Sequence, residues 1–142
     1  MGGQSQEISG MEPSPHVLVV DDDEWTRQMF RDILDAYPDI KIVAEAGDGR
    51  EAVLMANLHH PDLVIMDIAL PYVNGIEATQ RIKKALPKTV VIGISGNYMP
   101  QIYNAMRTAG AVCFMCKDQV LTVHDTIIHA LAMWDGEGSA TT

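Results

Sequence analysis

Short apolar runs alternate with helical stretches along most of the chain, and this alternation constrains the fold more than any other feature. Five runs are brief and rich in β-branched residues, as buried strands are; they are residues 16–20, 40–45, 62–66, 89–94 and 111–115. Apolar side chains recur at helical spacing over residues 24–37, 50–59, 75–86, 100–109 and 119–134. The pattern predicts five strands and five helices in alternation.

Proline and glycine stand where the helical stretches have to end. Pro38, Pro61 and Pro87 each close one stretch, and Gly110 follows another, because proline cannot continue a helix and glycine is favoured just after one. Strand–helix–strand repeats form right-handed crossovers, which give a parallel sheet covered by helices on both faces. We therefore expect an α/β fold: a five-stranded parallel sheet of order 2-1-3-4-5, doubly wound and flavodoxin-like, with five helices.

A chain of 142 residues predicts one domain, which we place at residues 16–134. Residues 1–15 are rich in Gly, Ser, Gln and Pro and are expected to form a disordered lead-in or a cloning remnant, with 135–142 as a flexible tail. The sequence has no apolar stretch long enough to span a membrane, and its amino terminus lacks the basic and apolar regions of a secretory signal. A cytoplasmic location is expected.

Polar residues follow four of the predicted strands. They stand at the strand ends: Asp21, Asp22 and Asp23 at the end of the first strand, Asp67 at the end of the third, Ser95 at the end of the fourth and Lys117 at the end of the fifth. In a doubly wound sheet the carboxyl ends of the strands meet at one edge, and the functional site lies where the first and third strands are neighbours. Taken singly, each residue is ordinary; Asp23, for example, is interpreted as a helix cap. Their convergence at one edge is what points to a site.

The chemistry of this group requires both a cation and an anion. Carboxylates packed together repel one another, and one takes up a proton unless a cation compensates. Mg²⁺ prefers oxygen ligands and needs only a few carboxylates when a phosphate is present. A carboxylate can act as a nucleophile on phosphorus, while an ammonium such as that of Lys117 and a hydroxyl such as that of Ser95 stabilise the transferring group. The net charge of −9 argues against direct nucleic-acid binding, which requires clustered basic residues.

Four segments resemble the receiver family of bacterial-type response regulators, and together they cover roughly residues 16–134. They are VLVVDDDEWTRQMF, PDLVIMDIALPYVNGIEA, VVIGISG and GAVCFMCKD. The second segment has the family's proline four residues after its aspartate, Pro71, and the glycine eight residues after it, Gly75. The sequence departs from the family pattern in having a third acidic residue, Asp23, and Asp118 where proline is common.

The resemblance implies a role for each residue at the predicted edge. In the family pattern the phosphoacceptor is Asp67, the metal ligands are Asp21, Asp22, Asp67 and the backbone carbonyl of Ala69, the phosphate-binding cation is Lys117, the switch hydroxyl is Ser95 and the switch aromatic is Phe114. The implied cofactor is Mg²⁺. The implied donor is a phosphohistidine on a partner histidine kinase or histidine phosphotransfer protein. The chain would then be a stoichiometric phosphoacceptor in a phosphorelay rather than an enzyme.

Phosphorylation in this family implies a changed surface on the fourth helix, fifth strand and fifth helix (100–109, 111–115 and 119–134), which is also a possible homodimer interface. Leu121 and Ile128 lie seven residues apart on this last helix, beside its core-facing stripe, and are interpreted either as peripheral core or as a partner-binding face. The sequence leaves open whether the chain is a stand-alone regulator or a piece of a hybrid kinase or longer regulator. It names neither the kinase nor the output.

Several alternatives remain. A receiver fold used only as a phosphorylation-independent docking module would have the same sequence pattern. A nucleotide-binding protein of similar fold would need a Gly-rich loop where DDDEW stands, and a phosphatase with an aspartate nucleophile would need a second Asp at Ala69. Cys113 and Cys116 are expected on opposite faces of a strand, so they predict no dithiol site, and the five-residue spacing of His124 and His129 is not that of a metal pair.

Overall fold

The computed structural model describes residues 14–97 and 99–133. Strands and helices alternate as predicted, with one additional 3₁₀ helix. In chain order the elements are β2 (His16–Val20), α2 (Glu24–Leu34), β3 (Lys41–Ala46), α3 (Gly49–His59), β4 (Leu63–Asp67), α4 (Gly75–Ala85), β5 (Val90–Ser95), α5 (Pro100–Ala109), β6 (Cys113–Cys116), the 3₁₀ helix η1 (Lys117–Thr122) and α6 (Val123–Met133).

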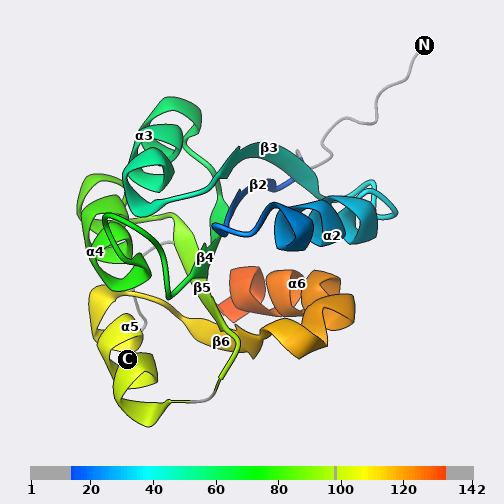
Figure 1. Ribbon diagram of the computed structural model, residues 1–142. Coiled ribbons are helices and arrows are strands. Elements are labelled where there is room, and N and C mark those ends of the chain that lie inside the picture. The colour runs from blue at the N-terminus through cyan, green and yellow to red at the C-terminus, as the bar shows by residue number, and fades with distance from the viewer. Residues whose placement is uncertain (1–13, 98, 134–142) are drawn as a thin grey trace.

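The five strands form one sheet of order β3-β2-β4-β5-β6, and every neighbouring pair is parallel. This confirms the predicted order 2-1-3-4-5. Helices α2 and α6 cover one face of the sheet, while α3, α4 and α5 cover the other (Figure 1). The winding reverses between β2 and β4, the first and third strands along the chain, so these two strands are neighbours at the centre of the sheet.

The core consists of two apolar clusters, one on each face of the sheet. One packs side chains of α2 and α6 against alternate strand residues such as Val19, Ile65 and Ile92. The other packs α3, α4 and α5 against the intervening residues such as Leu18, Val64 and Val91. All five residues of β4 are buried, as expected for the central strand of a sheet covered on both faces.

The predicted helix over 24–37 ends earlier, at Leu34. Pro38 disfavours helical backbone at Tyr37, and the N–H of Tyr37 instead bonds to the Leu34 carbonyl in a turn. The predicted helix over 119–134 was also inaccurate. Its first part is the 3₁₀ helix η1, with non-helical dihedrals at Gln119, and α6 begins only at Val123.

The first predicted strand matches β2, and the other four begin one or two residues later than predicted. Asp67 and Ser95 are the last residues of β4 and β5, in agreement with their predicted place at the strand ends. Residues 1–13 of the predicted lead-in and residues 134–142, including the predicted tail, lie outside the described residues. Leu121 is largely exposed, which contradicts its interpretation as peripheral core. No helix among the described residues is long and apolar enough to cross a membrane.

Candidate functional site

Three aspartates come together at the carboxyl edge of the sheet. Val20 of β2 is paired with Met66 of β4, so the next residue of each strand, Asp21 and Asp67, lies at the same level. Both are buried, with 0% and 2% of their surface exposed, whereas Asp22 is exposed. One carboxylate oxygen from each of the three lies within 4.8 Å of the others.

Lys117 supplies the positive charge of the site. It is the first residue after β6, and its Nζ lies 3.0 Å from Asp21 Oδ2 and 3.2 Å from Asp67 Oδ2. The side chain is about one-third exposed, so its ammonium is accessible to a molecule that enters the site. Three acids and one amine from three separate stretches of the chain therefore form one cluster.

Burial and charge shift the proton affinities in this cluster. The pKa of Asp67 is raised to about 6, first because burial disfavours the charged carboxylate and second because of the charge of Asp21, while the charge and hydrogen bond of Lys117 lower it. Burial also acts to lower the pKa of Lys117, but its attraction to the two aspartates outweighs burial and raises it. The amine is therefore protonated at neutral pH and supplies one positive charge to two buried carboxyl groups.

The donor atoms of the cluster fit a hard divalent ion. Asp21 Oδ1 accepts the N–H of Asp23 at 2.9 Å, whereas the buried Asp21 Oδ2 accepts no hydrogen bond from the described residues and contacts only the Lys117 ammonium as an ion pair. Among the residues that the structure describes, this is the only group of three His, Cys, Asp or Glu side chains close enough to hold a metal. Carboxylate oxygens with unused lone pairs are the ligands that Mg²⁺ prefers.

The loop after β4 is held directly against the site. The N–H of Ala69 donates to Asp67 Oδ1 at 3.2 Å, and the N–H of Gly75 donates to the Ile68 carbonyl at 3.0 Å. A Cβ atom at Gly75 would lie 2.2 Å from the Asp67 carbonyl oxygen. Only glycine therefore allows α4 to begin this close to Asp67, which gives a physical reason for the glycine at this position.

Ser95 and Phe114, the two predicted switch residues, make their interactions elsewhere and share no hydrogen bond with the acidic cluster among the described residues. Ser95 Oγ donates to the Asn97 carbonyl at 2.7 Å and accepts the N–H of Asn97, although Ile94 beside it is paired with Asp67 in the sheet. Phe114 stacks on Tyr103 of α5, with 4.4 Å between the ring centroids. The structure thus brings together Asp21, Asp22, Asp67 and Lys117 and leaves the other two residues outside.

The two cysteines and His124, which the sequence did not predict as functional, all have structural surroundings. Cys113 packs on the face of α2 and α6, while Cys116 lies near the Tyr103 hydroxyl on the α5 side, so the two cysteines do point to opposite faces, and both are free. His124 stacks on Tyr37 and pairs with Asp39, a contact for which the sequence gave no signal.

Sequence reasoning also missed Arg27. Its guanidinium donates to the Asp21 carbonyl oxygen and to Glu45, which connects the acidic loop to the edge strand β3. Its position in the sequence could have indicated this contact, because Arg27 lies one turn into the helix that Asp23 caps and is therefore close to the loop that contains Asp21.

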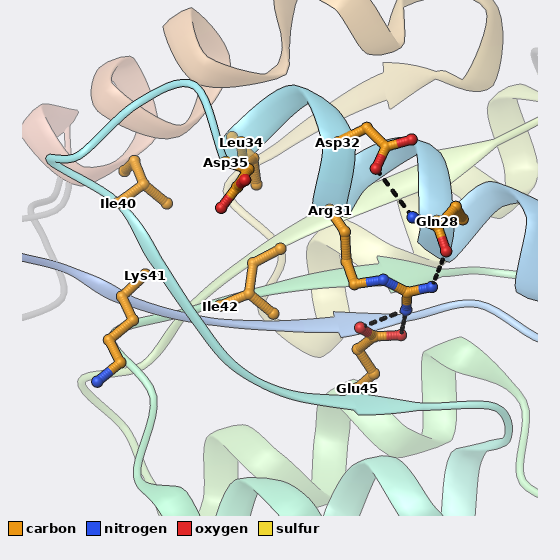
Figure 2. Close-up of a pocket in the computed structure, with 9 residues that line it drawn as sticks. All are labelled: Gln28, Arg31, Asp32, Leu34, Asp35, Ile40, Lys41, Ile42 and Glu45. Atoms are coloured by element: carbon orange, nitrogen blue, oxygen red, sulfur yellow. Dashed lines mark hydrogen bonds and ion pairs between the residues drawn. The ribbon is translucent and has the colours of Figure 1, made fainter.

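Hollows in the described part of the chain include two that lie apart from the acidic cluster. One, of about 480 Å³, lies between α2 and β3 and is lined by Arg31, Ile42 and Glu45 among others (Figure 2). The other, of about 320 Å³ and largely apolar, lies between the start of α4 and the loop after β5 and includes Ala69 and Ser95. None of the three clustered aspartates lines either hollow.

The fold and the site together define a doubly wound α/β protein with a buried acidic pocket where the sheet reverses its winding. The chain belongs to the response regulator receiver domain family, whose model matches residues 17–129. The protein is therefore a receiver domain of the kind found in two-component signalling proteins, as its sequence predicted.

Known relatives agree with this assignment. The chain is 45% identical over 85 residues to a protein-glutamate methylesterase/protein-glutamine glutaminase of Nitrosospira multiformis, covering 60% of this chain and 24% of that protein. It is 34% identical over 116 residues to the transcriptional regulatory protein YxjL of Bacillus subtilis, covering 81% and 51%. The chain thus spans about a quarter to half of these two relatives.

Solved structures include similar receiver domains. The response regulator domain of Thermotoga maritima CheB is 36% identical, with a TM-score of 0.77 over 83% of this chain and 96% of that one. A chain of the CheX–CheY–BeF3–Mg²⁺ complex from Borrelia burgdorferi is 28% identical, with a TM-score of 0.71 over 80% and 88%.

Proposed function

We propose that Asp67 is the phosphoacceptor of this receiver domain and that the chain takes a phosphoryl group from a partner phosphohistidine in a Mg²⁺-dependent reaction. The observation that carries this proposal is the buried carboxylate of Asp67, which shares the ammonium of Lys117 with the neighbouring carboxylate of Asp21. A buried carboxylate with a raised pKa beside a cation is a group prepared for chemistry or ion binding rather than for stability.

In the proposed reaction, a carboxylate oxygen of Asp67 forms a bond to phosphorus while the bond from phosphorus to the donor nitrogen breaks and the donor histidine leaves. Lys117 binds the equatorial oxygens of the transferring group as a point charge. Asp21, Asp22, Asp67 and the carbonyl of Ala69 would hold Mg²⁺, which supplies positive charge next to the transferring group when it is bound. The Mg²⁺ in the complex of the Borrelia relative supports this choice of ion.

Ser95 and Phe114 would act after the transfer. The Ser95 hydroxyl would leave Asn97 and turn toward the phosphoryl group, and Phe114 would respond by a change of ring position, which alters the surface of α5, β6 and α6. The support for this is the position of Ser95 at the end of β5, beside the strand that carries Asp67. Phe114 lies at the boundary between β6 and α5.

The partner would be a histidine kinase or a histidine phosphotransfer protein. Three large apolar side chains, Trp25, Tyr72 and Met99, are exposed on segments that follow β2, β4 and β5, and these segments all begin at the edge that holds the acidic cluster. Exposed aromatic side chains are enriched at protein interfaces. A homodimer through α5, β6 and α6 stays a prediction; the exposed Leu121 and Ile128 lie in this region. A cytoplasmic location also stays a prediction.

A phosphoryl transfer assay tests the proposal. Acetyl phosphate with Mg²⁺ is expected to add about 80 Da, the mass of one phosphoryl group, to the intact wild-type chain and nothing to Asp67→Asn. Asp32→Asn, which changes an exposed aspartate on α2, is the matched control and is expected to gain the same mass as wild type. Modification of Asp67→Asn at the wild-type rate would contradict the assignment.

The same assay separates an acceptor from an enzyme. A stoichiometric acceptor yields one phosphoryl group per chain and releases it slowly, whereas a phosphatase would turn over an excess of phosphomonoester. A docking module would bind its kinase equally well as wild type and as Asp67→Asn and would gain no mass. The activity of any longer protein that contains this domain is a separate question, because the matched relatives carry further sequence.

A further inference from the structure

We propose that Arg27 is a positioning residue for the acidic site: it fixes the peptide bond between Asp21 and Asp22 and thereby sets the affinity of the site for a divalent ion. This inference rests on the proposed function, since it takes the three clustered carboxylates to be the ligands of that ion. Arg27 itself contacts neither Asp67 nor Lys117 through any hydrogen bond or ion pair within the part of the chain that the structure describes.

The contacts of Arg27 join three elements. Its Nη1 donates to the Asp21 carbonyl oxygen at 2.6 Å, and its Nε donates to Glu45 Oε1 at 3.1 Å. Arg27 lies on α2, Asp21 follows β2, and Glu45 lies on the edge strand β3. The Arg27 and Glu45 side chains are only 18% and 23% exposed, so water competes weakly for these bonds and the planar guanidinium is held at two points.

The orientation of the carbonyl that Arg27 binds affects the positions of two of the three carboxylates. It belongs to the planar peptide unit between Asp21 and Asp22, and the two side chains leave from the Cα atoms at either end of that unit. Rotation of this plane would move both carboxylates relative to Asp67. The neighbouring groups are already fixed, because the N–H of Asp21 donates to the Ala46 carbonyl and the N–H of Asp23 donates to Asp21 Oδ1.

Metal sites depend on such supporting bonds. Partners that orient the ligands without touching the metal typically contribute about 10-fold to 100-fold in metal affinity. Arg27 also places a positive charge at the backbone carbonyl of Asp21, whereas Lys117 pairs with the Asp21 carboxylate, in a chain of net charge −9. Orientation and charge are two different explanations, and the experiment has to separate them.

Arg31 provides the matched control. It lies one turn further along α2, and its guanidinium also pairs with Glu45 and with Gln28, as Figure 2 shows. Among the described residues, however, it makes no hydrogen bond to the loop of residues 21–23. Arg31→Gln therefore also removes one positive charge from α2 and one arginine partner of Glu45, but it leaves the bond from Arg27 to the Asp21 carbonyl in place.

The experiment measures Mn²⁺ binding to the full chain by the loss of the free-Mn²⁺ signal in electron paramagnetic resonance. Mn²⁺ is used as a paramagnetic substitute for Mg²⁺, and no phosphoryl donor is present. Arg27→Gln is expected to weaken binding about 10-fold and Arg31→Gln by less than about twofold. Arg27→Lys is expected to recover part of the affinity, because one ammonium reaches the carbonyl without the second anchor at Glu45.

Thermal unfolding in EDTA, followed by circular dichroism, shows whether each variant is folded. If Arg27→Gln is unfolded, the inference is tested with Arg27→Lys and Glu45→Gln instead. Glu45→Gln keeps the arginine but weakens its second contact. Weaker Mn²⁺ binding by these folded variants would support the inference. Equal Mn²⁺ affinity of wild type and folded Arg27→Gln would overturn it, and so would equal weakening by Arg27→Gln and Arg31→Gln, which would leave charge as the whole effect. If wild type itself binds no Mn²⁺, the ion site of the proposed function fails as well.

Discussion

The Nζ atom of Lys117 lies 3.2 Å from Asp67 Oδ2, although fifty residues of sequence separate the two. This ion pair joins the last strand region of the sheet to its central strand across β5. It counteracts the burial and the Asp21 charge that raise the pKa of Asp67 to about 6. The stability of the domain should therefore depend on the charges of this pocket.

Asp67→Asn should stabilise the metal-free domain at pH 7.5. The pKa of Asp67 is raised from its ordinary value of 3.8 to about 6 in the folded protein. Between these values the folded state binds a proton that the unfolded state has lost, so stability falls as pH rises. We expect a gain of about 2 kcal/mol in the free energy of unfolding. Urea unfolding in EDTA checks this, and the gain should vanish below about pH 4; an equal gain at all pH values would contradict the electrostatic cause.

Asp22→Asn should behave differently, because Asp22 is exposed and its charge costs little in the metal-free state. We expect its free energy of unfolding in EDTA to change by less than about 0.5 kcal/mol, while its Mg²⁺ affinity falls about 10-fold. Calorimetric Mg²⁺ titration measures the affinity. An unchanged affinity would remove Asp22 from the proposed ligands.

Lys117→Met should destabilise the metal-free domain, because it leaves two buried carboxylates without their counter-charge. Loss of one partner of a buried ion pair is strongly destabilising, but the amine is about one-third exposed, so we expect about 1–3 kcal/mol at pH 7.5. The loss should shrink at pH 4, where Asp67 is protonated. Lys88→Met, an exposed lysine before β5, is the control for loss of a lysine charge and should be near neutral in urea unfolding.

Gly75→Ala should be among the most damaging single-methyl substitutions in this domain. Its Cβ would lie 2.2 Å from the Asp67 carbonyl oxygen and 2.8 Å from Ile68 Cα, so backbone has to move, at a cost of about 2–4 kcal/mol. Gly96→Ala is the control, since a Cβ there meets nothing within 4 Å. Thermal unfolding of the pair should separate them clearly, and equal melting temperatures would contradict the tight packing of α4 on β4.

His124→Ala should destabilise the domain by about 1 kcal/mol. The imidazole stacks on Tyr37 at 3.8 Å between ring centroids and pairs with Asp39 at 3.0 Å, which ties the start of α6 to the turn after α2. His129→Ala, at an exposed position of the same helix, should be close to neutral. The comparison by urea unfolding isolates this contact, which would be unimportant if both variants unfolded alike.

The sequence predicted the strand order and the convergence of Asp21, Asp22, Asp67 and Lys117, because the topology of an alternating α/β chain forces strand ends to one edge. It did not predict the contacts that orient these groups. Arg27 reaches a backbone carbonyl and Glu45 on another element, and His124 meets an aromatic ring far away in sequence. Such pairings depend on the exact crossing of helices over the sheet, which periodicity does not specify.

Helix ends were predicted less well than strand order. Pro38 indicated the end of α2 only within a few residues. The turn that follows the helix depends on the packing of the Tyr37 side chain against the core as well as on the proline. Residues 119–122 of the 3₁₀ helix η1 (Lys117–Thr122) were predicted as the start of a longer helix, because their apolar spacing agrees with both.

The order in which the cluster's residues occur along the chain has a consequence for biosynthesis. A ribosome completes all three carboxylates long before it adds β6, which brings the lysine. A nascent or truncated product that stops after α5 therefore carries the acids without their amine, and it would be a poor competitor for a phosphoryl donor. Only the complete sheet brings the three carboxylates and the ammonium together, which we expect phosphoryl transfer to require. Incomplete copies of the domain would therefore not take phosphoryl groups away from complete ones.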